Sequence, residues 1–208
     1  GAAARRPRRF GLVLAFWLVG AGLLPSVASS QTLSASTPAN DPIALLRQGG
    51  HVLYIRHAAA EAEPRAERPT GEGCAGQRRL TAQGRTDAAA LGAVFKRFGV
   101  PLGEILATTY CRAADTARLA FGRFVVARDL FATGVGEDGE RVRYAGLRRF
   151  LATAPRAGVN NVLVAHAPPF RVATGESLKE SEVAIVEPLG PSGFKVVARV
   201  PLDAWPRP

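Results

Sequence analysis

The chain has 208 residues and a formal net charge of +10, with 27 lysines and arginines against 17 acidic residues. This length suits one domain that follows a short leader. Four arginines lie within the first nine positions, so the rest of the chain holds 23 basic and 17 acidic residues, a net charge of +6. Such a mild excess, with aromatic residues at 7% of the chain, argues against a nucleic-acid-binding surface.

The N-terminal segment has the order of a secretory signal peptide. The four arginines precede an apolar run from Phe10 to Leu24, and small residues follow it. The run has 15 residues, whereas a membrane-spanning helix needs about 20. We therefore predict a signal peptide over 1–29, cleaved near Ala28 or Ser29, and a protein that is periplasmic or secreted. An uncleaved anchor is the alternative, and membrane contact is expected only through this leader.

The rest of the chain predicts an α/β fold. Residues 30–41, rich in Ser, Thr, Ala, Pro and Asn, are predicted to be a linker to a domain over 42–208. Apolar residues at helical spacing predict helices over 42–48, 81–98, 113–121 and 141–154. Short β-branched runs predict strands over 51–56, 105–108, 124–126, 162–165, 183–186 and 194–200, the last two as a hairpin. Strands that alternate with helices indicate a three-layer α/β/α sandwich with a largely parallel central sheet.

Basic side chains come directly after three of the predicted strands. The first strand ends in Arg56 and is followed by His57, and the fourth is followed by His166. Arg112 follows the second strand at the start of a helix, where backbone N–H groups favour an anion. Ligands bind at the carboxyl ends of the strands in open α/β sheets. The four side chains are therefore expected to form a phosphate pocket in which an imidazole acts as nucleophile.

The same residues lie in motifs that resemble those of the histidine phosphatase superfamily. Tyr54 to Ala58 resembles its Arg-His-Gly/Ala signature, and Leu80 to Arg85 is similar to the helix start that follows this signature. Thr109 to Ala117 resembles the second arginine motif of the family, and Val162 to Pro168 resembles its second histidine motif. The four motifs occur in the family's order between residues 51 and 200.

The resemblance implies a phosphoglycerate mutase-like fold and a hydrolase of phosphoric monoesters, of the histidine acid phosphatase type, that uses no cofactor and no metal. His57 would be the catalytic nucleophile that forms a phosphohistidine. Arg56, Arg112 and His166 would be catalytic as well, and would bind the phosphoryl group of the substrate. That substrate would be a phosphorylated small molecule or an envelope glycan.

The chain departs from the family at the general acid. Many members place a carboxylate directly after the second histidine, where this chain has Ala167, or between the second arginine and that histidine. The candidate acids near the motifs are Glu61, Glu63, Glu137, Asp138, Glu140, Glu180 and Glu182. Without an acid, two other functions compete: a phosphohistidine protein phosphatase, whose leaving group is already good, and a non-catalytic phosphate-binding module of the cell envelope.

The chain has two cysteines, Cys74 and Cys111. Export implies an oxidising compartment, in which such a pair usually forms a disulfide. The bond would tie the loop after the first strand to the segment that carries Arg112. Two buried free thiols are the alternative. No C-x-x-C spacing occurs, so a structural zinc site is not expected.

Overall fold

The computed structural model describes residues 41–62, 73–130 and 144–206 of the chain. The predicted signal peptide and linker lie outside these residues, as do parts of the two long loops, 63–72 and 131–143. In the described ranges, no helix combines the length and the apolar character needed to cross a bilayer.

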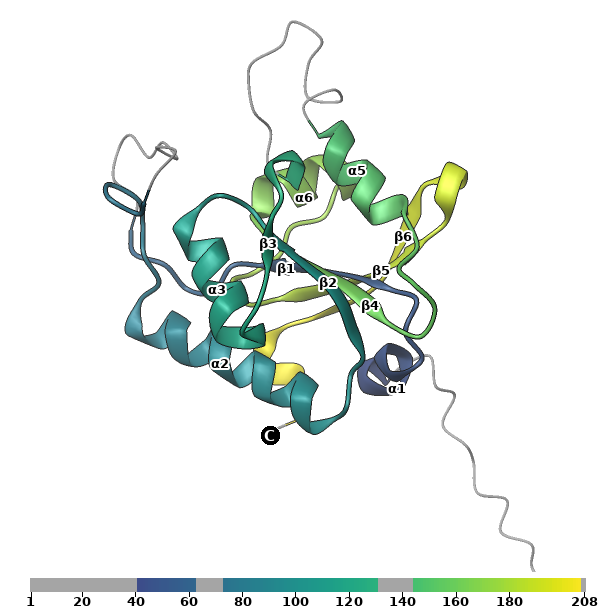
Figure 1. The fold of residues 1–208 in the computed structure, drawn as a ribbon, viewed down its shortest axis with the longest axis horizontal. Coiled ribbons are helices and arrows are strands. Elements are labelled where there is room, and N and C mark those ends of the chain that lie inside the picture. Colours follow the sequence, from purple (N-terminus) through teal and green to yellow (C-terminus); the bar gives the residue numbers. More distant parts are fainter. Residues whose placement is uncertain (1–40, 63–72, 131–143, 207–208) are drawn as a thin grey trace, which may run out of the picture. The chain divides into compact units, whose positions relative to one another are not determined.

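Six strands of the described chain form one sheet, in the order β3-β2-β4-β1-β5-β6 (Figure 1). The strands are β1 (Val52–Arg56), β2 (Leu102–Ala107), β3 (Val125–Val126), β4 (Asn160–Ala165), β5 (Val183–Pro188) and β6 (Phe194–Val200). The first four run parallel to one another, and β5 pairs antiparallel with both β1 and β6. The largely parallel sheet and the C-terminal hairpin are therefore confirmed.

Helices cover both faces of this sheet (Figure 1). On one face lie α1 (Pro42–Arg47), α2 (Ala82–Arg97) and α3 (Cys111–Phe121), and on the other lie α5 (Ala145–Ala152) and α6 (Ala167–Thr174). Successive side chains of a strand point to opposite faces. Accordingly Leu53 and Ile55 of β1 belong to the core under α1, α2 and α3, whereas Val52 and Tyr54 belong to the core under α5 and α6. The predicted three-layer α/β/α sandwich is confirmed.

Three short 3-10 segments complete the described chain, and the boundaries of some elements differ from the predicted ones. The 3-10 segments are η2 (Arg128–Leu130), η3 (Gly190–Ser192) and η4 (Leu202–Ala204). After η4, Trp205 is buried and meets Phe95 of α2 edge-on, with ring centroids 5.2 Å apart. The strand β2 begins at Leu102 rather than at Ile105, and α3 begins at Cys111 rather than at Ala113.

One helix was missed by the sequence patterns. Residues 167–174 form α6 immediately after β4, although Pro168 and Pro169 suggest a break. Proline is tolerated in the first turn of a helix because the N–H groups there have no intrahelical partner. The two prolines therefore lie in the first turn of this helix, which begins at Ala167 directly after its N-cap residue His166.

Helix α2 packs closely against α3 and against the segment that follows β1. A Cβ atom at Gly92 would overlap the backbone carbonyl oxygen of Ala120 in α3, and one at Gly84 would overlap that of Ala59. The N-cap side chain of Thr81 accepts a hydrogen bond from the Gly84 N–H over 3.0 Å. Glycine at these two positions thus lets α2 contact both α3 and the segment that follows β1.

Candidate active site

Parallel pairing of β1 and β4 brings His57 and His166 together. Arg56 is in register with Ala165, so the residue after each strand lies at the same edge of the sheet. The backbone N–H of His57 donates to the Ala165 carbonyl over 3.0 Å. The two imidazole rings lie with centroids 5.2 Å apart and are 4% and 3% exposed. The fold therefore brings the two histidines together, as the sequence predicts.

Hydrogen bonds define which nitrogen of His57 carries the proton. Nδ1 lies 2.8 Å from the carbonyl oxygen of Ala58, which can only accept, so Nδ1 is the donor. Arg112 donates from Nε to Nε2 of His57 over 3.1 Å, and a guanidinium cannot accept. Nε2 therefore carries the lone pair. This is the protonation state that a nucleophilic imidazole requires.

The second turn of α3 also holds the segment after β1. Thr116 donates from Oγ1 to the Arg112 carbonyl over 2.7 Å and accepts the Ala58 N–H over 3.0 Å. The guanidinium of Arg112 lies over the ring of Tyr110, 4.6 Å from its centroid. These contacts fix α3 and the His57 segment in one arrangement, with Arg112 in the first turn of the helix as predicted.

Three side chains that the sequence patterns left unassigned surround His166. Thr108, at the end of β2, places its hydroxyl 2.9 Å from Nε2 of His166. Tyr54 donates from its hydroxyl to the His166 carbonyl over 2.8 Å, and accepts the His166 N–H over 3.3 Å. Tyr110 meets the imidazole edge-on, with centroids 4.9 Å apart. Together they set the position and the orientation of this ring.

One guanidinium nitrogen of Arg56 has no hydrogen-bond partner among the described residues. Nη1 donates to the Leu178 carbonyl over 2.9 Å, and Nη2 lies 3.5 Å from Oε1 of Glu180. Nε is buried and has no hydrogen-bond partner within the described residues. Leaving a buried donor without an acceptor costs about 1–3 kcal/mol. An anionic ligand beside Arg56 would supply the missing acceptor.

Burial and positive charge keep both imidazoles neutral. Burial lowers the pKa of His57 to about 3, and the nearby charges of Arg112 and Arg56 act in the same direction against the hydrogen bond to Ala58. Burial also lowers the pKa of His166 well below its ordinary value, with His57 and Arg112 as further causes. At neutral pH the site therefore combines two uncharged imidazoles with permanently charged guanidinium groups.

Each described candidate for the general acid has a partner of its own. Glu180 lies against Arg56, as above, and Glu182 accepts the Lys179 N–H over 2.6 Å. Glu61 accepts the Arg79 N–H over 3.1 Å. The other four candidates, at positions 63, 137, 138 and 140, lie outside the described residues. In the described ranges, no group of three or more His, Cys, Asp or Glu side chains has an arrangement that could hold a metal ion.

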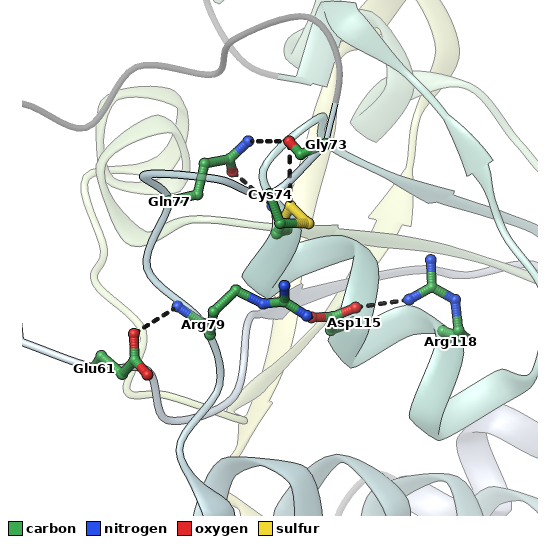
Figure 2. The surroundings of a disulfide bond; sticks show 8 residues. Glu61, Gly73, Cys74, Gln77, Arg79, Asp115 and Arg118 are labelled. Carbon is green, nitrogen blue, oxygen red and sulfur yellow. Dashed lines mark hydrogen bonds and ion pairs between the residues drawn. A yellow bond between two sulfur atoms is a disulfide. The ribbon is translucent and has the colours of Figure 1, made fainter.

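The two cysteines form a disulfide, Cys74–Cys111, and the prediction of this bond is confirmed (Figure 2). Cys111 is the first residue of α3 and precedes Arg112. The bond therefore ties the loop after β1 to the helix that carries the second arginine of the site.

Comparison with known proteins identifies the fold. No protein-family model and no curated protein sequence matches the chain. Among solved structures, the protein histidine phosphatase SixA in complex with tungstate aligns over 74% of this chain and 97% of its own, at 17% identity and a TM-score of 0.54. A candidate phosphohistidine phosphatase SixA from Agrobacterium tumefaciens aligns over 73% and 97%, at 16% identity and a TM-score of 0.50. A mycobacterial glucosyl-3-phosphoglycerate phosphatase aligns over 71% and 97%, at 17% identity and a TM-score of 0.50.

These structures and the sheet order define the class as α/β, with the phosphoglycerate mutase-like arrangement of strands and helices. The chain has the fold of the histidine phosphatase superfamily, and the resemblance drawn from its four motifs is confirmed at the level of the fold.

Proposed function

We propose that this protein is an exported, metal-independent phosphatase that hydrolyses a phosphomonoester through a phosphohistidine on His57. One observation carries the proposal: the lone pair on Nε2 of His57 faces the guanidinium of Arg112 inside a buried cluster of positive charge. A nucleophile and an oxyanion-binding cation are thereby held at hydrogen-bond distance. The likeness of the fold to structures of phosphatases supports the same reaction class.

The reaction follows from the protonation states. A phosphoryl group enters between His57 and Arg112, and the Arg112 hydrogen bond passes from Nε2 to a phosphoryl oxygen. The lone pair of Nε2 forms a bond to phosphorus while the bond from phosphorus to the ester oxygen breaks, and the departing alkoxide takes a proton from solvent water. A second water then attacks phosphorus and releases a proton to solvent while the bond to Nε2 breaks, and inorganic phosphate leaves with His57 restored. In the transition state of both steps, negative charge is spread over the three equatorial oxygens of the phosphoryl group.

The other predicted residues stabilise that charge. Arg56 offers its unsatisfied Nε to a phosphoryl oxygen, and Arg112 offers the donors that held His57. We infer that His166 binds a further oxygen, since Thr108 and Tyr54 hold its ring and its backbone in place. Such preorganised donors are the usual source of large rate enhancements.

The chemical nature of the leaving group is part of the proposal. Because the three described candidate acids each have another partner, we propose a substrate whose leaving group needs little help from a protein acid. A protein phosphohistidine meets this requirement, as does a phosphorylated small molecule with an acidic leaving group. An envelope glycan phosphate, which leaves as an alkoxide, would need a proton from an acid outside the described residues. The phosphohistidine is the second candidate, favoured by the fold of the SixA structures, which are phosphohistidine or protein histidine phosphatases.

Export rests on the composition of residues 1–29 and on the disulfide. The order of basic, apolar and small residues is that of a signal peptide. Disulfides persist in the periplasm and outside the cell and are rare in the cytosol. We therefore place the mature enzyme in the periplasm or the medium, where phosphorylated envelope components are within its reach.

Hydrolysis of p-nitrophenyl phosphate between pH 4 and 8, with EDTA present, tests the function. The wild type should turn over, His57→Ala should not, and the matched variant His51→Ala, at the opposite end of β1, should behave as the wild type. Activity that persists in His57→Ala, or that EDTA removes, would refute the mechanism. Binding of phosphate without hydrolysis of this or a phosphohistidine substrate would instead support a non-catalytic module.

A further inference from the structure

The N-terminus of α3, the helix that carries Arg112, is capped by a residue from another part of the chain. The N-cap residue of α3, Tyr110, makes no capping hydrogen bond with its side chain. The backbone N–H of Cys111, the first helical residue, instead donates to Oε1 of Gln77 over 2.9 Å. Gln77 is buried, although it is a polar residue from a loop. Gln77 therefore acts as a cap of α3, since the first N–H groups of a helix need an acceptor from outside the helix.

The disulfide is a second attachment of Cys111, in addition to the hydrogen bond from its backbone N–H to Gln77. Cys74 is bonded to Cys111, and its carbonyl accepts the backbone N–H of Gln77 over 3.2 Å. The side-chain amide of Gln77 donates to the Gly73 carbonyl over 3.3 Å. Figure 2 shows the resulting short turn against the start of the helix. Cys111 is thus held covalently through its side chain and by a hydrogen bond through its backbone.

The far end of the loop is bound to α3 one turn later. The guanidinium of Arg79 lies 3.0 Å from Oδ2 of Asp115, and Arg118 lies 2.6 Å from Oδ1 of the same carboxylate (Figure 2). The Arg79 N–H in turn donates to the carboxylate of Glu61. Residues 73–79 therefore run beside the first turn of α3 and are attached to it at both ends.

Arg112 is the residue that this attachment holds in place. It directly follows Cys111, donates to Nε2 of His57 over 3.1 Å and packs on Tyr110. We propose that Gln77 and the Cys74–Cys111 disulfide form a clamp that positions Arg112 for oxyanion binding, so that reduction of the disulfide weakens the site. Gln77 acts here as a positioning residue, and the inference rests on the proposed phosphatase function.

The redox step is a simple exchange. A dithiol reductant gives two electrons and two protons to the disulfide, which becomes the thiols of Cys74 and Cys111, and the reductant closes to its own disulfide. The covalent link to Cys111 is then lost, and the hydrogen bond from its N–H to Gln77 is left to hold the start of α3. In an oxidising compartment the bond persists, so full activity would coincide with successful export.

Tungstate affinity of the full chain, measured by isothermal titration calorimetry, tests the clamp. We expect the oxidised wild type to bind tungstate about tenfold more tightly than the reduced protein or the Cys74→Ser/Cys111→Ser variant, because a small misplacement of a positioned group is costly. Gln77→Ala keeps the disulfide and is expected to lose affinity in the same direction. Gln83→Ala, on the exposed side of α2, repeats the substitution away from the clamp and should leave affinity unchanged.

Two further measurements separate positioning from general stability. Circular dichroism at the assay temperature identifies the samples that are folded, and Gln77→Ala decides the test where the reduced chain unfolds. NMR titration of the histidine Cε1–H signals should show a higher pKa for His57 in the folded, clamp-weakened proteins, because the Arg112 charge has moved away. A structural defect that leaves Arg112 in place would not change that pKa.

The failure of the clamp and the failure of the proposed function give different results. Equal tungstate affinity in oxidised, reduced and Gln77→Ala proteins, with a clear loss in Arg112→Ala, would overturn the clamp and leave the phosphatase proposal standing. If the oxidised wild type neither binds tungstate nor hydrolyses the substrate, both the clamp and the phosphatase proposal are overturned.

Discussion

Arg112 donates a hydrogen bond from Nε to Nε2 of His57 over 3.1 Å, while Nδ1 of the same ring is held by the Ala58 carbonyl. The pair therefore consists of an imidazole with its lone pair directed at a guanidinium, which is an arrangement that a doubly protonated ring could not adopt. A phosphoryl group that inserts here meets the nucleophile and the charge-stabilising cation together.

The lowered pKa of His57 predicts how activity responds to acid. Since burial and the two arginines bring this pKa to about 3, Nε2 stays unprotonated well below pH 6.5. We expect kcat/KM for p-nitrophenyl phosphate to show no acid limb from this histidine between pH 5 and 8. An acid limb near pH 6.5 in the wild type that moves to higher pH when the Arg112 charge is removed would belong to His57 and would contradict the assignment.

The same shift makes the folded state sensitive to acid. Below pH 6.5 the unfolded chain protonates its histidines, whereas His57 in the folded chain stays neutral to about pH 3. The unfolded state then binds more protons, so the free energy of unfolding falls as the pH falls through this window. Urea denaturation at pH 7 and pH 4.5 should show a smaller loss for His57→Asn than for the wild type. Equal losses in the two proteins would be evidence against a depressed pKa.

Thr108 should influence turnover through His166. Thr108→Val keeps the size of the side chain but removes the hydroxyl that lies 2.9 Å from Nε2 of His166. One hydrogen bond contributes roughly 1 kcal/mol, so we expect kcat/KM to fall about fivefold to tenfold. Thr108→Ser restores the hydroxyl and should restore most of the activity. If the valine and serine variants were equally impaired, packing rather than the hydrogen bond would be responsible.

Glu180 is expected to be a partner of Arg56 and not the proton donor of the reaction. Oε1 of Glu180 lies 3.5 Å from Nη2 of Arg56, so this side chain already serves as the partner of a guanidinium that binds the phosphoryl group in the proposed reaction. Glu180→Gln should therefore change kcat by less than about fivefold, because a partly exposed ion pair of this length contributes at most about 1 kcal/mol. Glu176→Gln, which breaks the comparable pair with Arg199, is the matched control. A far larger loss with phenyl phosphate than with p-nitrophenyl phosphate would identify Glu180 as the acid.

Gly92 should be sensitive to a single methyl group. A Cβ there would overlap the Ala120 carbonyl, so Gly92→Ala must separate α2 from α3 despite the higher helix propensity of alanine. Overpacking of this kind typically costs about 1–3 kcal/mol of unfolding free energy. Thr86→Ala, on the exposed side of the same helix, should leave stability nearly unchanged. Equal unfolding free energies for Gly92→Ala and the wild type would show that the helices separate without cost.

The arrangement of the four site residues could be predicted because each follows a regular signal. Apolar β-branched runs mark β1 and β4, and parallel strands place the residues after them at one edge of the sheet. This logic brings together His57 and His166, and it locates Arg112 at the start of a helix. It requires only that the strands be parallel neighbours, which the alternation with helices already suggests.

The roles of the residues that position the site could not be predicted from the sequence, because they depend on contacts between distant parts of the chain. Tyr54 lies in an apolar run that predicts only a buried strand, yet its hydroxyl reaches the backbone of His166. Gln77 lies in an irregular loop, where no periodicity indicates that it caps α3. Thr108 carried a usable signal, since it ends a strand at the same edge as the histidines. Helix α6 was not predicted because a pair of prolines is typical of a loop, although proline is also tolerated in the first turn of a helix.

The central claim is a covalent phosphohistidine at Nε2 of His57, and trapping it is the most direct measurement. The full chain is mixed with a 32P-labelled phosphomonoester, quenched in alkaline denaturant, and analysed by peptide mass spectrometry and 31P NMR of the phosphorylated peptide. We expect an acid-labile label on His57, bonded to Nε2, present in His51→Ala and absent in His57→Ala. Turnover with the label on another residue, or turnover in His57→Ala, would contradict the account.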